Sequence, residues 1–207
     1  MAVSVPAYGP TRTFSGSRPV LADRLASSLT SDAVIVAGVA ALMSFVAQVS
    51  FKLPNNPVPV TGQTFGVLLS AAAVGPVRGL AGQLLYVVLG WIGLPVFADH
   101  THGWSVIHGA TGGYLVGFLL ATMLIGWQAR HGVDRRFDTL AGSFLLATAL
   151  IYIPGVWWLA HVAQLSYTAA IATGAAPFIL GDLLKALAAG ALVPAAWKLV
   201  GDRKKSW

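Results

Sequence analysis

The sequence predicts an all-α membrane protein, a compact bundle of six transmembrane helices with both termini cytoplasmic. Only 10% of the 207 residues are charged, against about 25% in soluble domains, and 56% are hydrophobic. Several uncharged runs approach the roughly 20 apolar residues that a membrane helix needs. No segment after residue 32 is polar enough to fold separately in water. We therefore expect one membrane domain, residues 32–200, followed by a basic cytoplasmic tail, 201–207.

The first three helices are predicted at residues 33–51, 62–74 and 77–97. The uncharged run AVIVAGVAALMSFVAQVSF supplies the first helix. The next residues, KLPNNPVPVT, hold three prolines and two asparagines, which remove backbone donors and favour turns, so they predict a loop. The motif GPVRG ends the short second helix, and Pro95 lies near the end of the third.

The last three helices are predicted at residues 112–128, 139–165 and 177–199. A second long loop precedes them, because ADHTHGWSVIHGATGG has glycines, three histidines and no long apolar run. The basic segment ARHGVDRRFD links the fourth helix to the fifth, and the small residues of SYTAAIATGAA predict a loop before the sixth. Pro177 suits a first helical turn, where its missing N–H is not needed.

The distribution of cationic residues predicts the orientation. Cytoplasmic loops of membrane proteins are enriched in Lys and Arg. With six helices, eleven of the thirteen Lys and Arg residues fall on one side, in the N-terminal tail, the turn after the second helix, the linker after the fourth and the C-terminal end. Only Lys52 and Lys185 lie elsewhere. This asymmetry favours cytoplasmic termini, with the loops after the first, third and fifth helices facing outward.

The N-terminal tail, residues 1–31, mixes Ser, Pro, Gly and Arg without a continuous apolar region. It lacks the pattern of a signal peptide, and we expect it to be largely disordered or to form a short surface helix near LADRLASSL. The net charge of +6 is spread along the whole chain without a recognition motif. A nucleic-acid partner is therefore not predicted.

Two charged residues, Asp182 and Lys185, interrupt the sixth helix in the stretch PFILGDLLKALAAG. With a rise of 1.5 Å per residue, Lys185 lies about 12 Å along the helix from Pro177 and about 20 Å from Lys198. A central Asp or Lys costs roughly 2.5 to 3.5 kcal/mol on insertion scales, whereas a water-exposed helical pair returns only about 0.2 to 0.5 kcal/mol. The pair must therefore face protein or a wet cavity.

Two readings of this pair remain open. It is either a buried salt bridge that ties the sixth helix to its neighbours, or part of a solute site, and charges inside membranes are more often functional. A carboxylate acceptor and an ammonium donor on one helix face suit a ligand that has N–H donors together with a carbonyl or carboxylate. The pair lies in the outward half of its helix, within reach of the outer loops.

Other chemistry has weaker support. His100, His102 and His108 share a loop with a single carboxylate, Asp99, and lack a helical ligand spacing such as HExxH, so no metal site is predicted. The chain has no cysteine, which excludes disulfides and thiolate metal sites. It has no GxSxG motif, no phosphate loop and no ATP-binding element. We predict no enzymatic activity and no cofactor, and any ATP hydrolysis must come from another subunit.

Three segments resemble the BioY family, the biotin-specific substrate-capture subunits of energy-coupling factor transporters. They are AQVSFKLPNNPVPVTGQTFGVLL, GLPVFADHTHGWSVIHGATGGYLVGF and GAAPFILGDLLKALAAG. The similarity runs from about residue 33 to residue 198, in the same order and with the same six helices. The chain departs from the family at Ala110, where a proline is frequent, and in its histidine-rich second loop. The resemblance implies a multi-pass protein of a bacterial-type cytoplasmic membrane.

The resemblance also implies how biotin is held. Biotin has a ureido ring with two N–H donors and one carbonyl, an apolar thioether ring and a valerate carboxylate. Asp182 is expected to accept a ureido N–H, and Lys185 to donate to the ureido carbonyl or to the carboxylate. Further binding residues are expected in the second helix, along the aromatic wall and in the second loop: Gln63, Tyr114, Tyr152, Trp158 and Asp99.

The implied partners are a transmembrane coupling subunit and two cytoplasmic ATPases. A stripe of small residues on the first helix resembles the surface with which such subunits meet the coupling protein: Ala37, Ala40, Ala41 and Ser44. Small residues also allow helices within one bundle to pack closely, so the stripe could equally face the sixth helix. The main alternative function is a stand-alone proton-coupled vitamin transporter in which Asp182 cycles a proton. A membrane enzyme or a purely structural bundle is a third, weaker class.

Overall fold

The computed structural model describes residues 18–24, 28–54 and 56–202, with side chains placed as far as residue 200. Its α-helices are α1 (Leu29–Gln48), α2 (Gln63–Val74), α3 (Pro76–Trp91), α4 (Trp104–Ile107), α5 (Gly112–Arg130), α6 (Phe137–Val162), α7 (Tyr167–Gly174) and α8 (Ile179–Asp202). Short 3-10 helices are η1 (Leu21–Arg24), η2 (Ala98–His100), η3 (Val133–Arg135) and η4 (Ala176–Phe178). Strands β1 (Ser50–Phe51) and β2 (Val60–Thr61) pair antiparallel, with Ser50 opposite Thr61.

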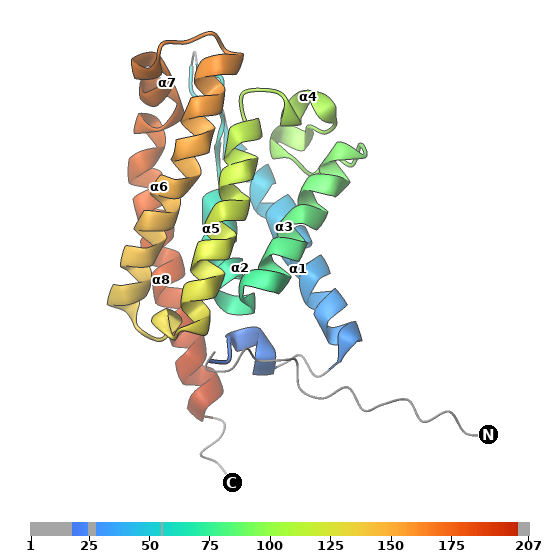
Figure 1. Cartoon of the computed structure of the whole chain (residues 1–207), viewed down its shortest axis with the longest axis vertical. Helices are drawn as coiled ribbons and strands as arrows, with labels where there is room; N and C mark the ends of the chain where they lie inside the picture. Colours follow the sequence, from blue (N-terminus) through green and yellow to red (C-terminus); the bar gives the residue numbers. More distant parts are fainter. Residues whose placement is uncertain (1–17, 25–27, 55, 203–207) are drawn as a thin grey trace, which may run out of the picture.

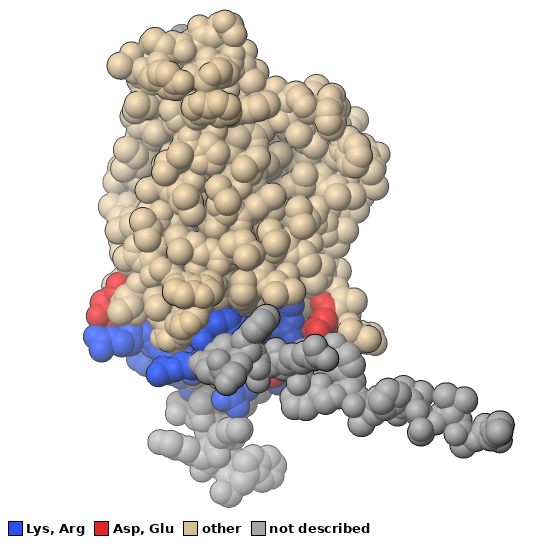
Figure 2. Space-filling view, in the orientation of Figure 1, with Lys and Arg blue, Asp and Glu red and all other residues tan. Residues whose placement is uncertain are grey.

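The long helices run side by side along the molecule (Figure 1). Helix α5 packs most extensively against α6, α1 packs against α3, and α2 contacts both α5 and α8. Helices α4 and α7 and the β1–β2 pair gather at one end, which we call the loop end. At the other end α1 begins and α8 finishes, and Figure 2 shows the Lys and Arg side chains of the visible face gathered there. We call this the arginine end.

Close packing at small residues joins the central helices. A Cβ added to Gly117 of α5 would lie 2.7 Å from the backbone of Ile151 in α6. Only glycine therefore allows α5 and α6 to approach this closely, as in other membrane helix pairs. Large side chains from different helices complete the core, among them Met43, Leu68 and Phe144, each fully buried.

Each of the six helices predicted from the sequence has a counterpart with shifted ends, namely α1, α2, α3, α5, α6 and α8. Helix α3 finishes at Trp91, six residues before the predicted end, and Gly93 then adopts a positive φ of 108°. The prediction of a loop over residues 166–176 was wrong, because α7 occupies most of it. Ser166 caps that helix by accepting a hydrogen bond from the Ala169 backbone N–H, and the alanines that follow are strong helix formers.

Four helical segments among the described residues are long and apolar enough to cross a membrane. They are α1, α5, α6 and the segment Tyr167–Val200, which contains α7 and most of α8. Helix α2 has 12 residues and α3 has 16, fewer than the roughly 20 that a full crossing needs. The structure thus has the long apolar helices of a multi-pass membrane protein.

Residues 18–24 of the N-terminal tail pack across the arginine end, and we call this segment the N-terminal strap. Its Val20 and Ala22 are buried against Ala129 of α5. Asp23 of η1 binds Arg78 of α3, with 2.6 Å between Oδ1 and Nη1, and also binds Arg130 of α5. The tail was predicted to be disordered or to form a short surface helix near LADRLASSL. Residues 1–17 and 25–27 of that prediction lie outside the described residues.

Candidate substrate-binding site

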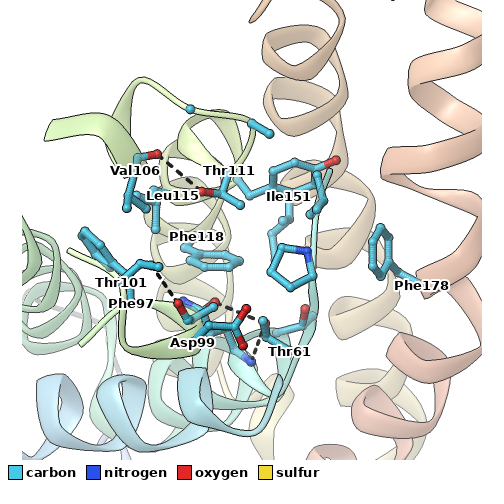
Figure 3. Close-up of a pocket in the computed structure, with 18 of the residues that line it drawn as sticks. Thr61, Phe97, Asp99, Thr101, Val106, Thr111, Leu115, Phe118, Ile151 and Phe178 are labelled. Carbon is cyan, nitrogen blue, oxygen red and sulfur yellow. Dashed lines mark hydrogen bonds between the residues drawn. The ribbon is translucent and has the colours of Figure 1, made fainter. Parts of the chain in front are cut away.

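A cavity of about 270 Å³ opens at the loop end of the bundle. This is close to the lower end of the range for small-molecule pockets, about 300 Å³. Residues of α2, α3, α5, α6 and α8 form its walls, and the segments around residues 57–61 and 97–111 close over it. Figure 3 shows apolar side chains from several of these elements around the space: Phe97, Leu115, Phe118, Ile151 and Phe178.

Asp182 and Lys185 both line this cavity. Lys185 Nζ lies 2.8 Å from Asp182 Oδ1 and donates a second hydrogen bond to the Thr61 carbonyl at 2.6 Å. The Tyr152 hydroxyl donates to the other Asp182 oxygen. Asp182 is buried and Lys185 is half-buried. The cavity wall therefore presents an acceptor and a donor side by side, each fixed by contacts to other parts of the bundle.

Gln63 also lines the cavity, at the first position of α2. Its amide Nε2 donates to the Tyr86 hydroxyl at 2.8 Å, and its Oε1 accepts from the Thr61 hydroxyl at 3.2 Å. Both contacts fix the orientation of the amide. Tyr86 is fully buried in α3 and packs edge-on against Phe97, with 5.4 Å between ring centres.

The three aromatic residues expected at the site have different positions. Tyr114 and Tyr152 line the cavity, and their rings meet edge to face with 6.5 Å between centres. The Tyr114 hydroxyl donates to the Gly174 carbonyl at 2.7 Å, which ties α5 to α7. Trp158 is not among the lining residues. Its indole N–H donates to the Gly109 carbonyl at 2.9 Å and so holds the loop that covers the cavity.

Asp99 lies at the rim of the cavity and joins its two covering loops. It accepts a hydrogen bond from Ser50 and pairs with Lys52, whose Nζ is 3.0 Å from Oδ2. We call these three residues the Asp99 clasp. The hydrogen bond from Ser50 and the charge of Lys52 lower the pKa of Asp99. Asp99 has a positive φ of 55°, a conformation that Asp tolerates better than most residues.

Several lining residues were not predicted from the sequence. They come from the covering loops and from four helices: Phe97, Val106, Thr111, Leu115, Phe118, Ile151 and Phe178. Most lie in runs that are apolar on every side, where no periodicity separates a wall residue from a lipid-facing one. Phe178 follows Pro177 directly in the motif that contains the charged pair, and this proximity was the only available signal.

The small residues of α1 face two directions. Ala37 and Ala41 are exposed, and a Cβ on the neighbouring Gly38 would meet nothing within 4 Å. Ala40 is buried against the core, and Ser44 is half-buried with its hydroxyl donating to the Ala40 carbonyl at 2.8 Å. The exposed part of this stripe is therefore a smooth surface on the outside of the bundle.

The histidines of the second loop do not converge. Within the described ranges, no three His or Asp side chains form a group that could hold a metal ion. His108 stacks on Trp104, with 3.9 Å between ring centres, and the backbone N–H of His100 donates to Gln48 Oε1. These contacts place the two residues in the covering loop itself.

The fold and the cavity together define the class of protein. Long apolar helices surround a pocket of small-molecule size, and one wall of that pocket holds a buried carboxylate and an ammonium group. This is a multi-pass membrane protein with a cavity of small-molecule size at one end. Residues 17–202 match the sequence profile of the BioY family, and the chain belongs to that family.

Relatives named as biotin transporters are similar to this chain over most of their own length. A probable biotin transporter BioY from Pyrococcus horikoshii is 37% identical over 155 residues, which cover 75% of this chain and 89% of the relative. The biotin transporter BioY from Thermotoga maritima is 37% identical over 152 residues, covering 73% and 88%. A crystal structure of the S-component for biotin from an ECF-type ABC transporter has a TM-score of 0.74. The match covers 82% of this chain and 92% of the chain in that crystal structure, at 22% sequence identity, so the two proteins share a fold.

Proposed function

We propose that this chain captures biotin from outside the cell and presents it for uptake. The observation that carries the proposal is the charged pair in the cavity wall, where Lys185 Nζ and Asp182 Oδ1 are 2.8 Å apart. A ureido group places an N–H donor next to a carbonyl acceptor, so one short edge of the ligand can meet both residues. The names of the curated relatives, which are biotin transporters, support the same ligand.

The remaining lining residues suit the rest of biotin. The thioether ring and the valerate chain are apolar, and the wall formed by Phe118, Ile151 and Phe178 offers them a matching surface. The covering loops would then act as a lid, held by the Asp99 clasp. We propose that the bound vitamin leaves the site chemically unchanged and that no cofactor takes part.

The proposed orientation has six crossings and cytoplasmic termini. The arginine end would face the cytoplasm, because the described Lys and Arg residues other than Lys52 and Lys185 belong to that end or to the linkers beside it. Helices α2 and α3 would complete the six crossings despite their shorter length. The chain would reside in the cytoplasmic membrane of a prokaryotic cell.

Labelling of single cysteines tests this orientation, since the chain has no native cysteine. We expect Thr101→Cys, at the loop end, to react with an impermeant maleimide added to intact cells. His131→Cys, in the linker after α5, should react only after the cells are opened. Equal labelling of both positions from outside would contradict the topology.

The partners are proposed to be a transmembrane coupling subunit and two cytoplasmic ATPases. The exposed surface at Ala37 and Ala41 suits close contact with another membrane helix. Replacement of both by Leu should abolish co-purification of partner subunits from native membranes and leave biotin binding unchanged. Ala149→Leu, at an exposed alanine of α6, is the matched control.

Binding by the purified protein tests the function itself. Detergent-solubilised chain, without a proton gradient or an ATPase, should bind biotin tightly at one molecule per chain. The competing function is a stand-alone transporter in which Asp182 carries a proton. That alternative predicts uptake into vesicles containing only this chain, driven by an imposed pH gradient and lost on Asp182→Asn. Absence of binding in detergent would contradict the capture function.

A further inference from the structure

Three arginines lie at the arginine end, and only Arg135 has a carboxylate within salt-bridge distance, with 3.5 Å between its Nε and Asp134 Oδ1. Arg18 and Arg24 are exposed on the N-terminal strap, and Arg135 lies in η3, in the linker between α5 and α6. Among the described residues, no carboxylate makes a salt bridge with Arg18 or Arg24. The nearest acidic residue in sequence, Asp23, already binds Arg78 and Arg130. We call Arg18, Arg24 and Arg135 the arginine triad.

Backbone and packing contacts hold two members of the triad in place. The Arg18 N–H donates to the Arg130 carbonyl at 2.7 Å. A Cβ on Gly132 would lie 2.7 Å from Arg18 Nη1, so the Arg18 guanidinium packs directly on that glycine. Arg135 Nη2 donates to the Pro19 carbonyl at 2.8 Å, and its guanidinium carbon lies 3.3 Å from the centre of the Trp197 ring. The strap and the linker therefore form one surface.

The like charges of the triad affect one another. Burial lowers the pKa of Arg135, Asp134 opposes this shift, and the charges of Arg24 and Arg18 lower the pKa further. Asp134 is fully buried and accepts a hydrogen bond from the Trp197 indole. Of the three arginines only Arg135 pairs with Asp134, so among the described residues the charges of Arg18 and Arg24 have no salt-bridge partner. Positive charge is concentrated here, and an anion would relieve the repulsion.

We propose that the arginine triad binds the phosphate of an anionic phospholipid headgroup. Guanidinium groups bind phosphate oxygens through paired hydrogen bonds, which gives Arg an advantage over Lys at such sites. The triad lies between the end of α5 and the start of α6, and in the orientation proposed above this end would face the headgroups of the anionic cytoplasmic leaflet. Phe137, two residues after Arg135, is about half exposed and offers an apolar surface to the acyl chains.

Native mass spectrometry of the full chain in detergent tests this site with defined lipids. The chain should retain phosphatidylglycerol about tenfold more strongly than phosphatidylcholine. The double variant Arg18→Gln/Arg24→Gln should reduce phosphatidylglycerol retention about tenfold, because charge-assisted hydrogen bonds are lost. Arg136→Gln is the matched control. It removes one charge from the same linker, but Arg136 is exposed and pairs with Asp138 at 2.8 Å, so retention should stay within about twofold of wild type.

Separate outcomes identify the anion and check folding. Inorganic phosphate at millimolar concentration should not displace the lipid, and full displacement would assign the site to free phosphate and overturn the lipid proposal. Equal retention of both lipids, or unchanged retention in the double variant, would also overturn it. Gel filtration and the midpoint of thermal unfolding report folding. If the double variant is misfolded, Arg135→Lys keeps the charge, loses the planar fork and should still lower retention severalfold.

Discussion

The two ends of the bundle both contain carboxylates paired with cations, but the pairs are built differently. At the arginine end, Arg78 binds Asp23 of the strap and Asp32 of α1, with 2.8 Å between Nε and Asp32 Oδ1. Each of these contacts joins two separate segments. At the loop end, Asp182 and Lys185 lie three residues apart on α8, and their shared surface faces a cavity.

The difference indicates which pair is structural. A charge that links distant segments stabilises the fold, and its partners satisfy it without a ligand. The bonds from Arg78 and Arg130 outweigh burial and lower the pKa of Asp23, which shows that its charged form is favoured in the folded protein. Asp182 and Lys185 pair within one helix, and their contacts to other elements are single hydrogen bonds with Tyr152 and the Thr61 carbonyl rather than salt bridges. The position of this pair in a cavity wall leaves it accessible to a ligand, as the following variants would test.

The largest effect is expected for Arg78→Met. This change leaves Asp23 and Asp32 without their shared partner in a site where Arg78 is only 8% exposed. Loss of one member of a buried ion pair costs about 3 to 5 kcal/mol. The midpoint of thermal unfolding in detergent should fall markedly, while biotin affinity of the folded fraction stays unchanged. Arg136→Gln serves as the exposed control, and a midpoint equal to wild type for Arg78→Met would contradict the structural role.

The second-largest effect is expected for the charged pair in the cavity wall. Asp182→Asn and Lys185→Met should each fold nearly normally and lose biotin affinity by about 1.5 to 3 kcal/mol, which is roughly ten- to a hundredfold. The double variant should bind no better than the single ones. Equilibrium binding and thermal unfolding, measured on all three, provide the check. If the single variants are unstable and the double variant recovers both stability and biotin affinity, the pair is a structural bridge like those of the arginine end.

A smaller effect is expected for Tyr152→Phe. The Tyr152 hydroxyl donates to Asp182, and its removal leaves the carboxylate less firmly positioned. One hydrogen bond is worth about 0.5 to 1.5 kcal/mol net, so biotin affinity should fall roughly two- to tenfold. Tyr167→Phe, at an exposed tyrosine of α7, should leave affinity unchanged. Equal effects of the two changes would show that Tyr152 does not act through Asp182.

The smallest effect belongs to the Asp99 clasp. Lys52 and Asp99 are partly exposed, with side-chain exposures of 69% and 33%, and such pairs contribute at most about 1 kcal/mol. Lys52→Met should speed biotin dissociation up to about fivefold without lowering the unfolding midpoint, and high salt should reduce the difference from wild type. An unchanged dissociation rate in both Lys52→Met and Asp99→Asn would show that the Asp99 clasp does not hold the covering loops over bound biotin.

The pH dependence of the clasp follows from the lowered pKa of Asp99. A carboxyl group with a depressed pKa contributes stability that is fully present above its ordinary value, about 3.9, and is lost as the pH falls through the lower folded value. The clasp should therefore contribute equally from pH 5 to pH 8. Measured across that range, the ratio of the dissociation rates of Lys52→Met and wild type should stay constant, and a ratio approaching one at pH 5 would contradict the assignment.

Helix α7 and the N-terminal strap show where local patterns were insufficient. Residues 166–176 were predicted to be a loop because of their small residues, yet Ser166 caps a helix there. In the strap, the short helix η1 (Leu21–Arg24) lies in the stretch where a short helix was one of the two expectations, but the sequence did not show that Asp23 binds two arginines, from α3 and α5. Asp23 is 55 positions from Arg78 and 107 positions from Arg130 in the chain. Contacts over such distances cannot be derived from local composition.

The sequence by itself determined the membrane class, the approximate positions of six helices and the asymmetric distribution of arginines, because these follow from local hydropathy and charge. It also singled out Asp182 and Lys185, since charges inside an apolar helix are costly unless they have partners or a use. Only the tertiary structure decided which apolar residues form the cavity wall, that Gln63 bonds Tyr86, and that Trp158 supports the covering loop. The physical reason is that a helix apolar on every side has no periodicity to distinguish a face toward lipid from a face toward the core.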